Sequence, residues 1–194
     1  MGWFVIGGEE YLRFSYFLLR STDARDGELL AKHNITHILS IHDTAAPILE
    51  GMTYLCISAA DHSKQNLTQY FRDSIMFIHE SRLKGEGCLV HCVAGVSRSV
   101  TLVVAYIMTV TGRGWVESLA AVRAARPCAG PNLGFLRQLE EFENTELTEV
   151  SDTDITLLSG PWQEAPPGSI RTCETRKHKN SGEEVKLVTC INGT

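Results

Sequence analysis

The chain has 194 residues, of which 43% are hydrophobic, and 18 Lys and Arg against 23 Asp and Glu give a formal net charge of −5. This length and composition predict one buried core with tails, and the acidic balance argues against nucleic acid as a partner. The 6 cysteines form no CxxC pair and no regular pattern, so neither a zinc site nor a disulfide scaffold is expected. Cysteines used in this way fit a reducing compartment, so we expect a cytoplasmic location that can extend to the nucleus.

Residues 1–21 form an N-terminal segment whose apolar patches are interrupted by Glu9, Glu10 and Arg13. No run in it is long enough to span a bilayer. It also lacks a basic start and a small-residue cleavage site, so no signal peptide is expected. Residues 14–21 are predicted to form an edge strand of a sheet.

The following residues alternate between helical and strand patterns. A capped start predicts a short helix over 23–33, and the apolar, β-branched runs 35–42 and 52–59 predict buried strands. Asn66 is placed to cap a helix over 67–84 that has one apolar face. Further predicted elements are a strand over 87–91 and helices over 97–111, 115–125 and 132–143. The alternation predicts an α/β fold with a central, mostly parallel sheet flanked by helices.

Residues 148–194 differ in composition from the rest. They are polar, contain Pro161, Pro166 and Pro167, and lack amphipathic periodicity. Such a segment buries too little apolar surface to fold alone, so a disordered tail is predicted.

The most informative stretch is His91–Ser99, which reads HCVAGVSRS. It lies between a predicted buried strand and a predicted apolar helix, so its backbone N–H groups and the helix dipole form a nest for an anion. Gly95 supplies the freedom in φ that a tight loop needs. The predicted anion-binding residues are Val93, Ala94, Gly95, Val96, Ser97 and Arg98.

Two side chains in this stretch predict covalent chemistry. Cys92 lies in the positive field, which lowers a thiol pKa and makes the thiolate the form expected at neutral pH. Arg98 follows in the first helical turn, where its planar guanidinium can hold two oxygens of a tetrahedral anion. The pattern therefore predicts a cysteine nucleophile acting on a phosphate ester.

The string HCVAGVSRSVT resembles the signature of cysteine-dependent protein phosphatases, specifically the small atypical dual-specificity phosphatases. The stretches THILSIHD, FIHESRL, YIMTVTG and PNLGFLRQLEEFE are similar to the subgroup of the JNK-pathway-associated phosphatase. The resemblance covers residues 22–147, which we expect to be the catalytic domain, and implies the cysteine-phosphatase fold. It also implies hydrolysis of phosphotyrosine and phosphoserine or phosphothreonine through a cysteinyl-phosphate, on phosphorylated proteins such as MAP-kinase pathway components.

A leaving alkoxide or phenoxide must be protonated, so a carboxylic acid is required near Cys92. Asp61 follows the predicted strand 52–59 in a loop, which brings it to the same edge of the sheet as Cys92. The string DHSKQN resembles the family's general-acid loop at Asp61 and at Asn66. Asp43, at the end of the preceding strand, is the alternative acid.

Chemistry and the resemblance together imply two supporting residues. Ser99 can hydrogen-bond the sulfur and help it leave, and His91 would orient the loop through its ring. No cofactor is expected, and no metal, because Arg98 and the loop amides neutralise the phosphate.

Oxidation is a further expectation, because a partly exposed thiolate at Cys92 would form a sulfenic acid that a second thiol can rescue. Cys88 on the preceding strand or Cys128 in a later turn could supply that thiol. The alternative is that both are inert buried residues.

Two rival interpretations concern activity and membrane attachment. A phosphoprotein-binding pseudophosphatase usually lacks the cysteine, the arginine or the acid, and all three stand here, which favours an enzyme. Relatives in the subgroup begin with a myristoylation signal, and Gly2 is present, but Ile6 replaces the Ser or Thr that the signal needs. Membrane association is therefore not expected unless Gly2 is myristoylated.

Overall fold

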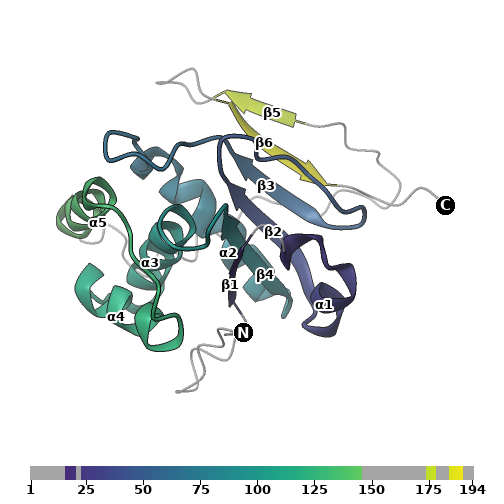
Figure 1. The fold of residues 1–194 in the computed structure, drawn as a ribbon, viewed down its shortest axis with the longest axis horizontal. Helices are drawn as coiled ribbons and strands as arrows, with labels where there is room; N and C mark the ends of the chain where they lie inside the picture. The colour runs from purple at the N-terminus through teal and green to yellow at the C-terminus, as the bar shows by residue number, and fades with distance from the viewer. Residues whose placement is uncertain (1–15, 21–22, 146–173, 178–183, 190–194) are drawn as a thin grey trace.

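The computed structural model of the chain describes residues 16–20, 23–145, 174–177 and 184–189 (Figure 1). Its strands are β1 (Tyr16–Arg20), β2 (Ile35–Ile41), β3 (Thr53–Ile57), β4 (Gly87–Cys92), β5 (Glu174–Lys177) and β6 (Glu184–Thr189). Its helices are α1 (Gly27–Lys32), α2 (Phe71–Leu83), α3 (Arg98–Thr111), α4 (Trp115–Ala125) and α5 (Leu133–Thr145), with 3-10 turns η1 (Asp23–Arg25) and η2 (Thr68–Tyr70).

A 6-stranded sheet with the order β1-β4-β2-β3-β6-β5 runs through the molecule. The strands β1, β4, β2 and β3 are parallel, and β6 and β5 continue the sheet in antiparallel pairing. The predicted α/β fold with a mostly parallel sheet is confirmed. The predicted edge strand within 14–21 is also confirmed, because β1 pairs with β4 and places Leu18 opposite Val90.

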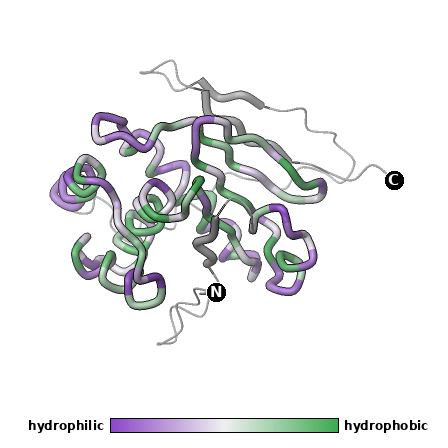
Figure 2. The backbone as a smooth tube through the Cα atoms, viewed as in Figure 1, coloured by the Kyte–Doolittle hydropathy of each residue, from purple (hydrophilic) through white to green (hydrophobic). Residues whose placement is uncertain are grey.

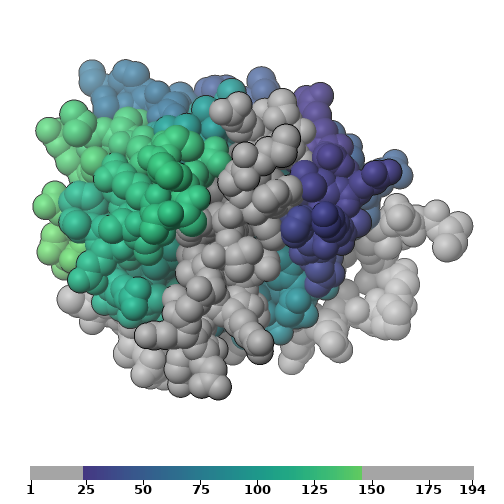
Figure 3. Space-filling model, turned by 60° about the horizontal axis from the view of Figure 1, so that its bottom comes forward, coloured from purple at the N-terminus to yellow at the C-terminus, as the bar shows by residue number. Residues whose placement is uncertain are grey.

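Side chains of the central strands alternate between two buried clusters, as the period of two in a strand requires. In β4, Cys88, Val90 and Cys92 belong to the larger cluster and Leu89 to the smaller one. The larger cluster includes residues of α2, α3, α4 and α5, whereas the smaller one includes η1 and α1. Helices therefore cover both faces, and Figure 3 shows the α1 region in purple and the later helices in green on opposite flanks. Cys92 faces the layer of α2 to α5.

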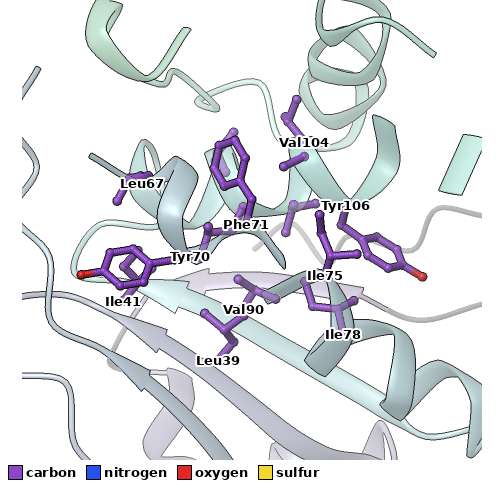
Figure 4. Packing of buried hydrophobic residues seen from close by; sticks show 14 of the residues in the cluster. Leu39, Ile41, Leu67, Tyr70, Phe71, Ile75, Ile78, Val90, Val104 and Tyr106 are labelled. Carbon is purple, nitrogen blue, oxygen red and sulfur yellow. The ribbon is translucent and has the colours of Figure 1, made fainter. Parts of the chain in front are cut away.

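The larger cluster ties β4 to its helices (Figure 4). Leu39 and Val90 lie on the sheet beside Ile78 of α2, and all three are almost fully buried. Phe71 meets Phe142 of α5 edge to face, with ring centroids 5.1 Å apart. Each such buried side chain contributes roughly 1.5–3 kcal/mol, so packing fixes the strand that ends at Cys92.

Helix α3 is the most apolar element of this layer, and its sequence appears green in the interior of Figure 2. Among the described residues, no single helix is long and apolar enough to cross a membrane. The helices α3 and α4 reach that length only as a pair, and they are bent by 119°.

Two predicted helices begin later than expected. The helix predicted over 23–33 is split, because Asp26 accepts a hydrogen bond from Leu29 N at 3.0 Å and so caps α1 after the η1 turn. The helix predicted over 67–84 opens with the η2 turn, and α2 proper starts at Phe71.

The disordered tail predicted over 148–194 is wrong for two strands. The sequence of β6, EVKLVT, alternates charged residues with Val185 and Leu187, and β3 offers its unpaired edge to this strand. The remaining tail residues lie outside the described part of the chain, as does Gly2 with the question of its myristoylation.

We expect Glu143→Ala to lower the free energy of unfolding by about 1 kcal/mol, the usual contribution of an acceptor at a helix N-terminus. The Glu143 carboxylate on α5 accepts a hydrogen bond of 2.8 Å from Trp115 N, the first residue of α4. Urea unfolding measures the change. Glu143→Gln keeps an acceptor oxygen and should lose clearly less, so equal losses for both variants would contradict this role.

Candidate active site

Residues 92–98, called the Cys92 loop below, join the end of β4 to the start of α3. Gly95 has φ 64°, the left-handed conformation that glycine adopts without strain. The predicted strand, loop and helix are therefore all present. Asp43 and Asp61 follow the carboxyl ends of the parallel strands β2 and β3, which is where open α/β sheets bind ligands.

The Cys92 sulfur lies at the base of this loop and is surrounded by donors. The residue is 1% exposed, and its Sγ accepts hydrogen bonds from Gly95 N at 3.2 Å and from Ser99 Oγ at 3.3 Å. Burial raises the pKa of the Cys92 thiol, but the Ser99 hydroxyl and the backbone N–H groups of Ser99, Val96 and Gly95 outweigh it, so the pKa is lowered. The direction of this pKa shift is the predicted one. The prediction that the Cys92 sulfur is partly exposed is wrong, because β4 carries it into the core.

Arg98 lies beside the loop with its charge almost fully buried. The residue is 6% exposed, and its Nη1 donates to Ala59 O at 2.9 Å and to Asp43 Oδ2 at 3.3 Å. Its Nε makes no hydrogen bond and lies 3.6 Å from Asp61 Oδ2. A buried N–H without an acceptor is costly, and an anion bound in the loop would supply one.

The Asp61 carboxylate is held against the Cys92 loop. Its Oδ1 accepts hydrogen bonds of 2.9 Å from Ser97 Oγ and of 2.9 Å from Asn132 Nδ2. The Asp61 side chain is 35% exposed, whereas that of Asp43 is 67% exposed. Both candidate acids thus contact Arg98, and Asp61 in addition accepts a hydrogen bond from Ser97 of the Cys92 loop.

Asn66 Oδ1 accepts a hydrogen bond of 3.4 Å from Gln69 N, so it caps the helical segment that begins with η2, as predicted. Its predicted support of the site stays a prediction. The amide that contacts Asp61 belongs to Asn132, which the sequence analysis did not single out. Asn132 Oδ1 also accepts from Phe135 N at 3.1 Å and so caps α5. An asparagine that directly precedes a predicted helix was the available signal.

The predicted anion-binding residues divide into two groups. Val93 is 54% exposed and Ala94 is exposed, so their side chains face outward. The side chain of Ser97 donates to Asp61 and accepts from Asn132 N at 3.2 Å. Any anion held by Ser97 must therefore be held by its backbone.

Arg126 is a second residue that the sequence analysis did not single out. Its Nε donates to Gly95 O at 2.7 Å and its Nη2 to Ala94 O at 3.4 Å, and Gly130 N donates to Val96 O at 2.9 Å. Because the C=O and N–H of a peptide point in opposite directions, these contacts turn the N–H groups of the loop towards the sulfur.

His91 is buried beside Cys92, and its ring lies 5.8 Å from that of His42. Burial lowers the pKa of His91 to about 4, against the effect of a hydrogen bond with the Cys92 backbone. Burial and then Arg98 also lower the pKa of His42. His91 Nδ1 makes no hydrogen bond, so the predicted orienting role rests on the contact with the Cys92 backbone.

The two candidate redox partners have different surroundings. Cys88 is fully buried, and burial raises the pKa of its thiol. It precedes Cys92 by four positions on β4, about 13 Å along a strand, whereas a disulfide needs Cα atoms within about 7 Å. Cys88 is therefore unsuitable. Cys128 is a free, exposed thiol in the turn that contacts the Cys92 loop through Arg126 and Gly130, and its redox role stays a prediction.

Among the described residues, no group of three or more His, Cys, Asp or Glu side chains could hold a metal ion. The site itself offers the Cys92 sulfur, the buried Arg98 guanidinium and the carboxylates of Asp43 and Asp61. Together they can bind a tetrahedral anion, attack it and transfer a proton.

Comparison with known proteins adds independent evidence. The family described as "Dual specificity phosphatase, catalytic domain" matches residues 16–145. Dual specificity protein phosphatase 22-B of Danio rerio is 75% identical over 127 residues, which are 66% of this chain and 69% of that protein. Dual specificity protein phosphatase 22 of Homo sapiens is 66% identical over 125 residues, which are 64% of this chain and 68% of that protein.

A solved structure shows the same fold. The crystal structure of DUSP15 has a TM-score of 0.69 and 43% sequence identity, and the match covers 77% of this chain and 94% of that one. The family match begins at β1, before the expected domain start at residue 22. The predicted resemblance to atypical dual-specificity phosphatases is confirmed. The chain belongs to the dual-specificity protein phosphatases.

Proposed function

We propose that this phosphatase removes phosphate from phosphotyrosine and from phosphoserine or phosphothreonine in proteins through a cysteinyl-phosphate on Cys92. The proposal rests on one observation above all, the donors that converge on the buried Cys92 sulfur and lower the pKa of its thiol. The thiolate is the nucleophilic form of cysteine.

In the first step, Cys92 Sγ attacks phosphorus, and an S–P bond forms as the P–O bond to the substrate breaks. Asp61 gives its proton to the leaving oxygen. Arg98 and the N–H groups of the loop hold the other phosphoryl oxygens, where negative charge collects.

In the second step, water attacks phosphorus and Asp61 takes the proton of that water. The S–P bond breaks, and Cys92 leaves as a thiolate. The Ser99 hydroxyl already donates to this sulfur at 3.3 Å, so it stabilises the charge that returns to it.

We assign the acid to Asp61 rather than to Asp43 because of its contacts. Asp61 contacts both Ser97 of the Cys92 loop and Arg98. Asp43 contacts Arg98 Nη1 with a carboxylate that is mostly exposed, which suits a group that orients the guanidinium.

The side chains of the loop support a phosphoprotein as the substrate. Val93, Ala94 and Val96 carry no charge, and Val93 and Ala94 are exposed. A loop that bound several phosphates of an inositol lipid would carry basic side chains at these positions, so a monophosphoester on a protein fits better.

We infer kinase signalling, such as the JNK pathway, as the setting, with phosphorylated MAP-kinase pathway components as partners. The support is the similarity of the stretches 36–43, 77–83, 106–112 and 131–143 to the JNK-pathway-associated subgroup. A cytoplasmic location, extending to the nucleus, fits this setting and a cysteine pattern with no CxxC pair and no regular spacing.

Cys92→Ser should lower kcat at least about 10³-fold, because no other group can form the covalent intermediate. It should still bind a phosphotyrosine peptide, whereas Arg98→Ala should lose both binding and turnover. Aryl phosphate hydrolysis and calorimetric peptide binding measure the two effects. Cys128→Ser removes an exposed thiol and serves as the control that keeps normal turnover. Near-normal activity of Arg98→Ala would show that the anion is held elsewhere.

Asp61→Asn should lower kcat by roughly 10²–10⁴-fold for phenyl phosphate, whose leaving group needs a proton. The loss should shrink for 2,4-dinitrophenyl phosphate, because its phenol leaves without help. Asp43→Asn is the matched control, and its effect should not depend on the leaving group. If Asp43→Asn alone showed this dependence, the two roles would be exchanged.

Ser99→Ala should move the acidic limb of the kcat/KM profile to higher pH. The thiolate of Cys92 forms as the pH rises above the pKa of its thiol, and the Ser99 hydroxyl helps to lower that pKa. Loss of the hydroxyl therefore raises the pKa, so a higher pH is needed to form the thiolate. We also expect kcat to fall by roughly 10–100-fold, the effect of one lost hydrogen bond to a charged group. Alkylation of Cys92 against pH, followed by mass spectrometry, reports the ionisation directly. An unchanged alkylation profile would show that Ser99 does not stabilise the thiolate.

A further inference from the structure

The acid loop, residues 61–66, carries Asp61 but contains no helix or strand. Its internal contacts are short-range, such as Gln65 N to His62 O at 2.9 Å and Lys64 N to His62 Nδ1 at 3.1 Å. These contacts shape a turn, but they cannot place that turn relative to the Cys92 loop. Asp61 itself contacts Ser97 of the Cys92 loop and Asn132, the residue before α5. Two residues within α5 contact the rest of the acid loop.

Gln138 of α5 binds the C-terminal end of the acid loop and the two residues that begin the next helical segment with one side chain. Its Oε1 accepts from Leu67 N at 2.7 Å and from Thr68 N and Oγ1 at 3.3 Å each. Its Nε2 donates to Gln65 O at 2.8 Å. Leu67 precedes η2 without a side-chain cap of its own, so Gln138 satisfies donors that the start of this helical segment leaves open.

Gly134, one turn before Gln138 on α5, meets the acid loop backbone to backbone. A Cβ at Gly134 would lie 2.6 Å from both the carbonyl carbon and Cα of Ser63, and closer still to its carbonyl oxygen. The φ of Gly134 is not positive, so glycine is not needed for backbone conformation there. A helical glycine is less stable than alanine by about 1 kcal/mol, and the close approach to Ser63 explains its presence.

We propose that Gly134 and Gln138 are positioning residues for leaving-group protonation, which set the place of Asp61 through the backbone of the acid loop. Gly134 has no side chain, and the hydrogen bonds of Gln138 go to Gln65, Leu67 and Thr68, whereas Asn132 binds Asp61 itself. The inference rests on the proposed role of Asp61 as the general acid. It makes one face of α5 a support for the acid, separate from the support that Arg126 gives to the nucleophile.

The test compares Gly134→Ala and Gln138→Leu on phenyl phosphate and on 2,4-dinitrophenyl phosphate. The alanine methyl would displace the Ser63 backbone by about 1 Å, and a displacement of that size can cost about 10²-fold in rate. We expect a loss of that order for phenyl phosphate and less than about threefold for dinitrophenyl phosphate, since an acidic phenol needs little protonation. The pH dependence of Cys92 alkylation should stay as in the wild type.

Two controls separate positioning from general stability. Gly27→Ala makes the same change at the start of α1, where a Cβ meets nothing within 4 Å, and it should leave both rates unchanged. In an Asp61→Asn background, Gly134→Ala and Gln138→Leu should cause no further loss, because residues that act through one group are not additive with it.

The outcomes distinguish this inference from the proposed function. If Asp61→Asn itself showed no dependence on the leaving group, the acid role and this inference would both fall. If Asp61→Asn showed the dependence but both α5 variants lowered the two rates equally, or lowered neither, the inference alone would be overturned. If Gly134→Ala does not fold, Gln138→Leu decides by the same criterion, because it introduces no backbone clash.

Discussion

A buried thiolate is stable only where hydrogen-bond donors surround it, and the donors at Cys92 are spread over two elements. Gly95 N belongs to the loop and the Ser99 hydroxyl to α3. The first requires the left-handed conformation of Gly95, and the second requires that α3 begin directly after the loop. Both requirements depend on β4 and α3 being held by the same buried cluster.

Asp61, the proposed acid, is held near Cys92 by a different set of contacts. Asn132, which caps α5, contacts Asp61, and Gln138 of α5 contacts Leu67 and Thr68. These partners are 70 or more positions apart in the chain. Contacts over such distances order a loop that its own short-range hydrogen bonds leave free to move. The geometry of the site therefore depends on two parts of the fold. The sheet and α3 position the Cys92 sulfur, and α5 with its capping residue helps to position the Asp61 carboxylate.

The parts of the structure that follow local rules could be predicted from the sequence. Hydrophobic periodicity predicts the strand that ends at Cys92 and the helix that begins at Arg98, and Gly95 predicts the tight loop between them. The position of Asp61 at the edge of the sheet could be predicted because it comes shortly after a strand. The roles of Asn132 and Arg126 could not, because each depends on which turn of one helix faces which loop. The same holds for β6, since a short polar strand becomes visible only once the free edge of β3 is known.

The carbonyl groups of the Cys92 loop point away from the sulfur, which affects which of its residues can be substituted during evolution. Arg126 and Gly130 engage the oxygens of residues 94, 95 and 96. An anion bound as proposed is therefore received by main-chain N–H groups, which every residue type except proline possesses. The side chains at positions 93 and 94 are then free of the chemistry while standing at the mouth of the site. A single loop can thus keep its reactivity constant while its outer surface is altered to suit a different phosphoprotein, and selectivity can evolve there without weakening the nucleophile.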